Sequence, residues 1–213
     1  KRLNSAGVDV LQWDGYIRPQ GDQFYNHIGG ISGPSALIDI DIDHNGIYRA
    51  LDSKRGRIFT YNRRGNLLFA FGGIGSQEGT FTNPVSIATK NDQLVVLEGR
   101  SGQITVFEPT EFGKNAIEGV VHYQNGRYEE SNIAWEKVLT YNTNYELAYI
   151  NIGRSQLRQE LYPQALRNFK LGHDRVYYSR TFRRYRNILI KEYFPKVATA
   201  GILVTALYII LRK

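Results

Sequence analysis

Only a few residues of this sequence have the types and the spacing that chemistry would require. Asp41, Asp43, Asn45 and Gly46 match positions 1, 3, 5 and 6 of a calcium-binding loop, and Asp52 stands at position 12. Such a loop needs a helix on each side, whereas residues 36–42 and 47–51 have the alternating pattern of strands, and Asn45-Gly46 is typical of a hairpin turn. We therefore expect a turn here and no metal ion.

The other candidates for chemistry are weaker. The four histidines lie far apart, and none has a second metal-binding side chain two to four residues away: His27, His44, His122 and His173. The glycine-rich stretch 72–75 lacks the following Lys-Ser/Thr of a phosphate-binding loop, and no serine lies in a nucleophile elbow. The absence of cysteine excludes disulfides, thiolate metal sites and a cysteine nucleophile. We expect no catalytic residue, no cofactor and no metal ligand, and therefore a protein that is not an enzyme.

Length and composition allow one large or two small folded domains. The 213 residues are 42% hydrophobic and 13% aromatic, which is enough to bury a core and excludes a disordered or collagen-like chain. The sequence contains no methionine. We therefore expect it to be a processed or trimmed part of a longer chain.

The basic excess lies entirely near the C-terminus. Residues 1–174 hold 18 basic and 19 acidic side chains, whereas residues 175–213 hold nine basic ones and a single acid, Glu192. This basic run resembles a nucleic-acid-binding surface, but fifteen uncharged residues, 197–211, follow it. At 1.5 Å per residue they cover about 22 Å of helix, so they span a bilayer of about 30 Å only if the segment continues or if Lys196 and Arg212 snorkel.

Aromatic residues support the membrane interpretation of this segment. Tyr193, Phe194 and Tyr208 stand near its two ends, where membrane proteins place interfacial aromatic rings. We therefore expect a transmembrane helix that begins at residue 197. The alternative is a buried C-terminal helix of a soluble domain.

The first half of the chain contains a repeated pattern of short strands. Residues 33–71 form four alternating segments with turns at 44–46, 54–56 and 64–66, and residues 83–107 repeat three of them. Asp52 and Glu98 are 46 residues apart, and Pro34 and Pro84 are 50 apart. The order of Pro, closing acid and Arg-Ile resembles that of NHL-repeat β-propellers over residues 33–109. The resemblance implies two propeller blades, an incomplete ring, and the end of a preceding blade in residues 1–32, where we expect Trp13 to be a core residue.

The second half has a helical pattern with a period of 34 residues. The equivalent pairs are Gly119 and Gly153, Tyr128 and Tyr162, Ser131 and Ala165, and Trp135 and Phe169. This is the period of tetratricopeptide (TPR) repeats, which the segment resembles. It departs from them at Thr143, where the family usually has Pro, and at Glu160, where it usually has Gly.

These patterns together predict the organisation of the chain. We expect NHL-like β-propeller blades, then an α-helical TPR-like solenoid, then a C-terminal transmembrane helix. The expected boundaries are residues 1–32 for the end of a blade and a loop, 33–112 for two blades, 113–174 for two helical repeats, 175–196 for a basic capping helix, and 197–213 for the start of the membrane helix.

The combination is similar to membrane-anchored proteins of Gram-positive bacteria that accompany carbohydrate ABC importers. By that resemblance we expect a non-catalytic accessory subunit that binds the permease or the sugar-binding protein, with its repeat domains outside the cell and no nucleic acid as partner. The alternatives are a tethered lactonase-like or carbohydrate-active propeller enzyme, using Asp39, Asp41, Asp43 and Glu98, and a cytoplasmic tail-anchored scaffold. The charge distribution favours the cytoplasmic orientation, because seven basic residues precede the span and two follow it.

Overall fold

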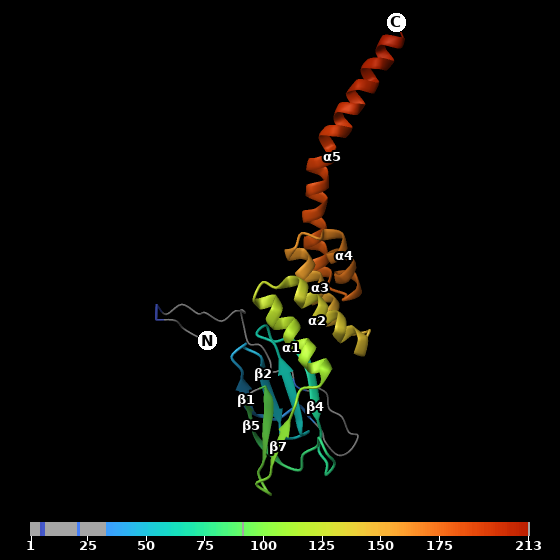
Figure 1. Cartoon of the computed structure of the whole chain (residues 1–213). Helices are drawn as coiled ribbons and strands as arrows, with labels where there is room; N and C mark the ends of the chain where they lie inside the picture. The colour runs from blue at the N-terminus through green and yellow to red at the C-terminus, as the bar shows by residue number, and fades with distance from the viewer. Residues whose placement is uncertain (1–4, 7–20, 22–32, 91, 213) are drawn as a thin grey trace. The chain divides into compact units, whose positions relative to one another are not determined.

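The computed structural model describes residues 5–6, 21, 33–90 and 92–212. Trp13, Tyr16 and His27 lie outside the described residues, and so does nearly all of the segment in which we expected the end of a blade. The chain divides into two compact units, Lys1–Glu108 and Pro109–Lys213. The first unit contains strands and the second contains helices (Figure 1).

The first unit is built from two antiparallel sheets. The larger sheet has the order β1 (Leu37–Ile42), β2 (Tyr48–Asp52), β3 (Arg57–Tyr61) and β4 (Leu67–Gly72). The smaller sheet consists of β5 (Pro84–Lys90), β6 (Gln93–Glu98) and β7 (Ile104–Phe107). Each strand pairs with the next one along the chain, because short turns connect them.

One hydrophobic cluster joins the two sheets. It contains Leu51 and Ile58 of the larger sheet, Ile87, Leu94 and Val96 of the smaller sheet, and Phe81 of the segment between them. The ring of Phe107 lies 5.4 Å from that of Phe71 and 5.5 Å from that of Phe81. The sheets are therefore held together mainly by apolar burial and ring packing.

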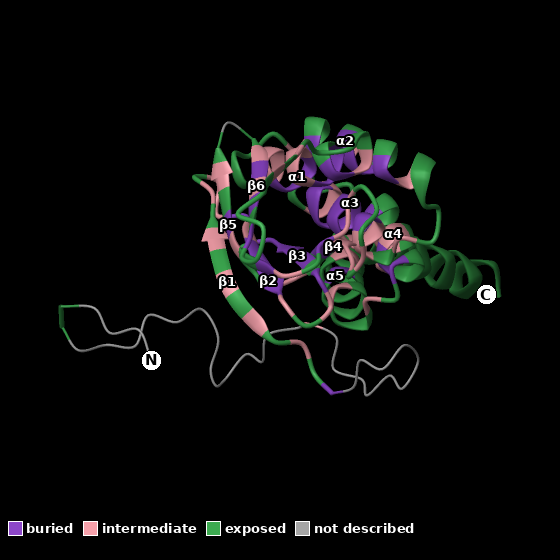
Figure 2. Cartoon of the chain, turned by 90° about the horizontal axis from the view of Figure 1, so that it is seen from below, coloured by how far each residue is buried: buried purple, intermediate pink, exposed green. Residues whose placement is uncertain are grey.

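The second unit is a series of helices that pack on their neighbours in the sequence. They are α1 (Glu111–Gln124), α2 (Tyr128–Tyr141), α3 (Glu146–Arg158), α4 (Tyr162–Leu171) and α5 (Arg175–Leu211). Side chains of Thr110 and Asp174 cap the first and last of them by accepting hydrogen bonds from backbone N–H groups. In Figure 2 the buried residues of α1, α2 and α4 lie mainly along one side of each helix, as expected for amphipathic helices, whereas α3 has five consecutive buried residues, 151–155.

Two glycine–ring contacts recur 34 residues apart in these helices. A β-carbon at Gly119 would lie 2.7 Å from the indole of Trp135, and one at Gly153 would lie 2.8 Å from the ring of Phe169. Both rings are fully buried. The 34-residue spacing in the sequence therefore corresponds to two similar helix–helix contacts, α1 with α2 and α3 with α4.

The expected fold class is wrong. The structure is a mixed α/β protein in which two small sheets share one core and do not close into a propeller ring. A closed propeller needs about four to eight such sheets. Neither do the helices form a TPR-like solenoid: α5 does not turn back after one repeat length but continues for 37 residues, so it leaves the packed helices.

Candidate functional site

The aspartates of β1 join the two sheets. Asp39 Oδ2 accepts hydrogen bonds from Ser86 Oγ at 2.7 Å and from the Ile87 backbone N–H at 2.8 Å. Asp41 Oδ2 accepts one from the Thr89 backbone N–H at 2.9 Å. The hydrogen bonds from Ser86 and Ile87 hold the pKa of Asp39 below its ordinary value. These carboxylates therefore replace backbone pairing between β1 and β5.

Asp43 stabilises the turn that the sequence places at residues 44–46. Its Oδ1 accepts hydrogen bonds from the backbone N–H groups of Asn45 and Ile47, and its Oδ2 lies 3.5 Å from Arg49 Nη1. Arg49 also donates to Thr89 Oγ1 at 3.1 Å. The apparent calcium-loop pattern is thus a hairpin turn between two strands, as the alternation on both sides predicts.

Asp52 and Glu98 have equivalent structural roles in the two sheets. Asp52 Oδ1 accepts from the backbone N–H of Ala36, at the start of the larger sheet. Glu98 accepts from the backbone N–H groups of Thr82 and Asn83, just before the smaller sheet. Each acid closes its sheet by holding the beginning of the first strand, which explains why the two recur in the sequence.

Beside Glu98 lies a polar hollow of about 450 Å³. Hydroxyl groups contribute most of its functional groups: Ser76, Thr80, Thr82, Ser101 and Thr105. Two carboxylates line it. Glu98 accepts a hydrogen bond from the Thr82 hydroxyl, and Glu78 is exposed in a loop. The hollow can donate and accept hydrogen bonds, and the described residues that line it include no histidine.

The histidines and glycines singled out in the sequence have local roles. His44 lies exposed in a turn, and His173 Nδ1 lies 2.9 Å from Glu146 Oε1 with both side chains exposed. His122 has a buried Nδ1 without a hydrogen-bond partner among the described residues. Gly72 has a φ of +87°, and a β-carbon there would lie 2.5 Å from the carbonyl oxygen of Gly56, so this glycine permits a close approach of two chain segments.

The described part of the chain contains no group of three or more His, Asp or Glu side chains placed to hold a metal ion. Asp39 and Asp41 come from β1, Asp43 from the turn after it and Glu98 from β6, and each accepts hydrogen bonds that fix the strands or the turn. The structure thus brings the first two candidates to one sheet junction but does not bring all four to one site.

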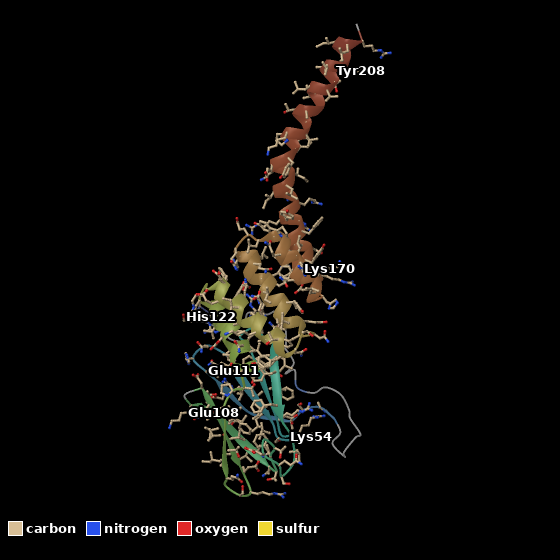
Figure 3. The ribbon with its side chains drawn as sticks, turned by 45° about the vertical axis from the view of Figure 1, so that its right-hand side comes forward. Lys54, Glu108, Glu111, His122, Lys170 and Tyr208 are labelled. Atoms are coloured by element: carbon tan, nitrogen blue, oxygen red, sulfur yellow. The ribbon has the colours of Figure 1, made fainter. Side chains whose placement is uncertain are left out.

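The most distinctive functional feature is the second part of α5. Within the described residues, α5 is the one helix long and apolar enough to cross a membrane. Its residues 197–211 are almost all exposed, up to 77% for Leu211. Figure 3 shows the side chains of this part, including Tyr208, standing away from the other helices of the unit.

The same helix is packed at its beginning. The ring of Tyr177 stacks on Phe169 at 5.3 Å, and the ring of Tyr185 stacks on Tyr162 at 5.7 Å. Thr181 lies between these two positions and is 1% exposed. The residues that pack are four apart, so one side of the helix contacts α4.

Pro195 lies inside α5 without ending it. Proline lacks a backbone N–H and normally bends a helix. The Thr199 hydroxyl donates to the carbonyl of Pro195 at 2.8 Å. The segments expected at 175–196 and 197–213 are therefore parts of one helix over its described length.

Near the two ends of the apolar segment a cation lies over an aromatic ring. Lys196 Nζ is 5.1 Å from the Tyr193 ring, and the Arg212 guanidinium is 5.9 Å from the Tyr208 ring. Such pairs of aromatic and basic residues are typical of the two interfaces of a membrane helix.

The sequence analysis did not identify a cluster of arginine and tyrosine side chains on α1, α3 and α5. The guanidinium of Arg154 lies 4.6 Å from the Tyr123 ring centre and 5.7 Å from that of Tyr177. Arg158 Nε donates to the Tyr123 hydroxyl at 3.5 Å. The spacing of the two arginines, four residues apart on a predicted helix, was the available signal.

Comparisons with known proteins give little information about this chain. No family model and no curated protein matches it. Among solved structures, the crystal structure of the computationally designed Ika4 protein is similar over 35% of this chain, with 20% sequence identity and a TM-score of 0.28. The match spans 41% of the Ika4 chain. Likeness at this level supports no argument about fold or function.

Proposed function

We propose that this protein is a membrane-anchored, non-catalytic scaffold that binds a protein partner. The observation that carries the proposal is that α5 is packed at its beginning and exposed at its end. Its first turns pack against α4 through Tyr177, Thr181 and Tyr185, and all but one of residues 197–211 are exposed. A helix of this kind would attach a folded unit rigidly to a bilayer.

Two further observations support binding rather than catalysis. The carboxylates that the sequence offered for chemistry are used to hold strands, and β1 presents a row of exposed apolar side chains. Ile38, Ile40 and Ile42 are 48%, 56% and 64% exposed and lie on one face of the strand, where exposed and half-buried residues alternate (Figure 2). Exposed apolar rows of this kind often mark protein contacts. The propeller-enzyme alternative is not retained, since the two sheets of the described residues do not close into a ring.

For the partner we take the permease subunits or the solute-binding protein of a carbohydrate ABC importer. This choice rests on the sequence resemblance to membrane-anchored proteins of Gram-positive bacteria. The same resemblance favours an extracellular position of residues 1–174. The basic residues before the apolar segment favour the opposite orientation, a scaffold facing the cytoplasm.

The test is a pull-down from detergent-solubilised native membranes, with the full chain as bait and mass spectrometry of the recovered proteins. A single-span membrane protein in the same detergent serves as control for co-solubilised material. Permease or solute-binding subunits in near-stoichiometric amount are expected. If only background proteins are recovered, the scaffold proposal fails, and if another partner is recovered, the transporter assignment fails.

Sidedness is tested separately on intact cells and on permeabilised cells. Added protease degrades residues 1–174 in intact cells if they lie outside. Protection until permeabilisation refutes the extracellular orientation and supports the cytoplasmic scaffold.

A further inference from the structure

The helical unit contains a buried arginine whose charge has no acidic partner. Arg154 is 6% exposed, and its Nη1 donates to Asn151 Oδ1 at 3.1 Å. Its guanidinium lies between the rings of Tyr123 on α1 and Tyr177 on α5. Three helices that are not consecutive in the sequence therefore surround one positive charge.

Among the described residues, no carboxylate lies within ion-pair distance of Arg154 or Arg158. Burying a charge without a counter-charge is costly, and the two ring contacts offset only part of that cost. Arg158, one turn further along α3, adds a second positive charge. The positive charges of Arg154 and Arg158 are therefore not neutralised by a nearby carboxylate, and they attract anions.

Tyr123 reports the local field. Burial by itself raises the pKa of its hydroxyl, but the hydrogen bond from Arg158 and the charges of Arg154 and Arg158 outweigh burial and lower the pKa. A phenol that ionises more easily in spite of its burial indicates a positive environment. The ring of Tyr128 stands edge-on to that of Tyr123 at 5.5 Å and adds an aromatic wall.

Of the two arginines, Arg158 is the accessible one, because it is exposed whereas Arg154 is 6% exposed. A guanidinium presents up to five N–H donors, of which Arg158 uses its Nε on the Tyr123 hydroxyl. The remaining donors of Arg158 can meet an anion, and the buried charge of Arg154 adds to the positive field at that place.

We infer that Arg158, in the positive field of the buried Arg154, binds a carboxylate of a protein partner, with the Tyr123 hydroxyl as a second polar group. This inference rests on the proposed function, because the carboxylate is taken to belong to the partner protein. A carboxylate is planar and has two acceptor oxygens, which match guanidinium N–H groups in a bidentate arrangement.

The first experiment measures binding to the full chain in detergent, with a synthetic hexaglutamate peptide as the probe. Arg158→Gln is expected to weaken binding at least tenfold, and Arg158→Lys less, since lysine keeps the charge but loses the bidentate donors. The matched control is Arg183→Gln, an exposed arginine on α5, which is expected to leave affinity unchanged. Equal loss in Arg158→Gln and Arg183→Gln, or no binding at all, overturns the inference.

Competition and absorbance identify the anion and the site. Glutarate is expected to compete weakly, whereas inorganic phosphate that competes better than the peptide's carboxylates overturns the carboxylate assignment. Glutarate that binds as tightly as the peptide overturns the assignment to a protein source. Peptide binding should also raise the pKa of Tyr123, measured by the ultraviolet absorbance of the tyrosinate, and the shift should vanish in Tyr123→Phe.

The pull-down separates this inference from the proposed function. Loss of the partner with Arg158→Gln, and its retention with Arg183→Gln, supports the inference. Retention with both variants overturns the inference and leaves the scaffold function standing. Absence of any partner with the unmodified chain overturns the proposed function itself.

Discussion

The close contact between Gly153 and Phe169 predicts that Gly153→Ala destabilises the helical unit. Replacing Gly153 by Ala adds one methyl group on the inner side of α3. That methyl would lie 2.8 and 2.9 Å from two ring carbons of Phe169 and 3.2 Å from the carbonyl oxygen of Ala165. The Phe169 ring is fully buried and stacks on Tyr177, so it has little room to retreat.

Two opposing contributions determine the magnitude. Alanine in place of a helical glycine favours the helix by about 1 kcal/mol. Forcing a methyl group into a filled core costs about 1–3 kcal/mol. Because both close neighbours are held by packing or by backbone, we expect the upper part of that range and a net loss of about 1–2 kcal/mol in the free energy of unfolding.

The assay can be confined to the helical unit. The chain contains two tryptophans, Trp13 and Trp135, and Trp135 is fully buried between the helices. In a Trp13→Phe background, the fluorescence of Trp135 during urea unfolding in mild detergent reports this unit alone. Circular dichroism at the helical minimum gives an independent midpoint.

A double-mutant cycle shows whether the ring is the cause. Phe169→Leu shortens the side chain that the new methyl would meet, so Gly153→Ala should cost at least about 1 kcal/mol less in that background. If Gly153→Ala instead stabilises the unit by about 1 kcal/mol, as an ordinary helical glycine would, the close approach of α3 and α4 described above is refuted. An unchanged cost in the Phe169→Leu background would show that the ring is not responsible.

Two further predictions concern the strand unit and the membrane segment. Because the folded-state pKa of Asp39 is depressed, its stabilisation is present above the ordinary value near 3.8 and is lost as the pH falls through the lower folded-state pKa. Asp39→Asn should therefore cost about 1.5–3 kcal/mol of unfolding free energy at pH 7 and progressively less as the pH falls through the folded-state pKa, and a cost that does not change with pH in urea titrations would contradict this. Val204→Arg, at the centre of the apolar segment, opposes membrane insertion by about 2.5–3.5 kcal/mol and should increase the protein released by alkaline carbonate. Val176→Arg, on the exposed part of α5 that precedes the segment, should not, and equal release of both variants would show that residues 197–211 do not hold the chain in the membrane.

Local patterns were sufficient to place the strands but not to assemble them. Alternation and turn residues placed four strands within residues 33–71, and the structure has β1 to β4 between Leu37 and Gly72. Register within a hairpin depends on neighbours a few residues away. Closure of a ring depends on contacts between distant sheets, which neither the alternation nor the recurrence of Asp52 and Glu98 specifies.

The helical half illustrates the same limit. The 34-residue spacing corresponds to the contacts of Gly119 with Trp135 and of Gly153 with Phe169, because the fit of glycine to ring is local to each helix pair. The length of α5 depended instead on the apolar residues after Pro195, which favour a continuous helix over another turn. The spacing of Arg154 and Arg158 places them on one face of a helix, but the surroundings of Arg154 come from three separate helices, so spacing alone did not reveal the cluster.

The continuity of α5 has a mechanical consequence. Tyr177 and Tyr185 fix its rotation about its own axis, because each ring stacks on a ring of α4 or its N-terminal turn. A turn of the apolar segment within a bilayer would apply torque to both stacks and would move the Tyr177 ring relative to Arg154. Rotation of the apolar end would therefore be transmitted along the continuous helix to the contacts between α1, α3 and α5.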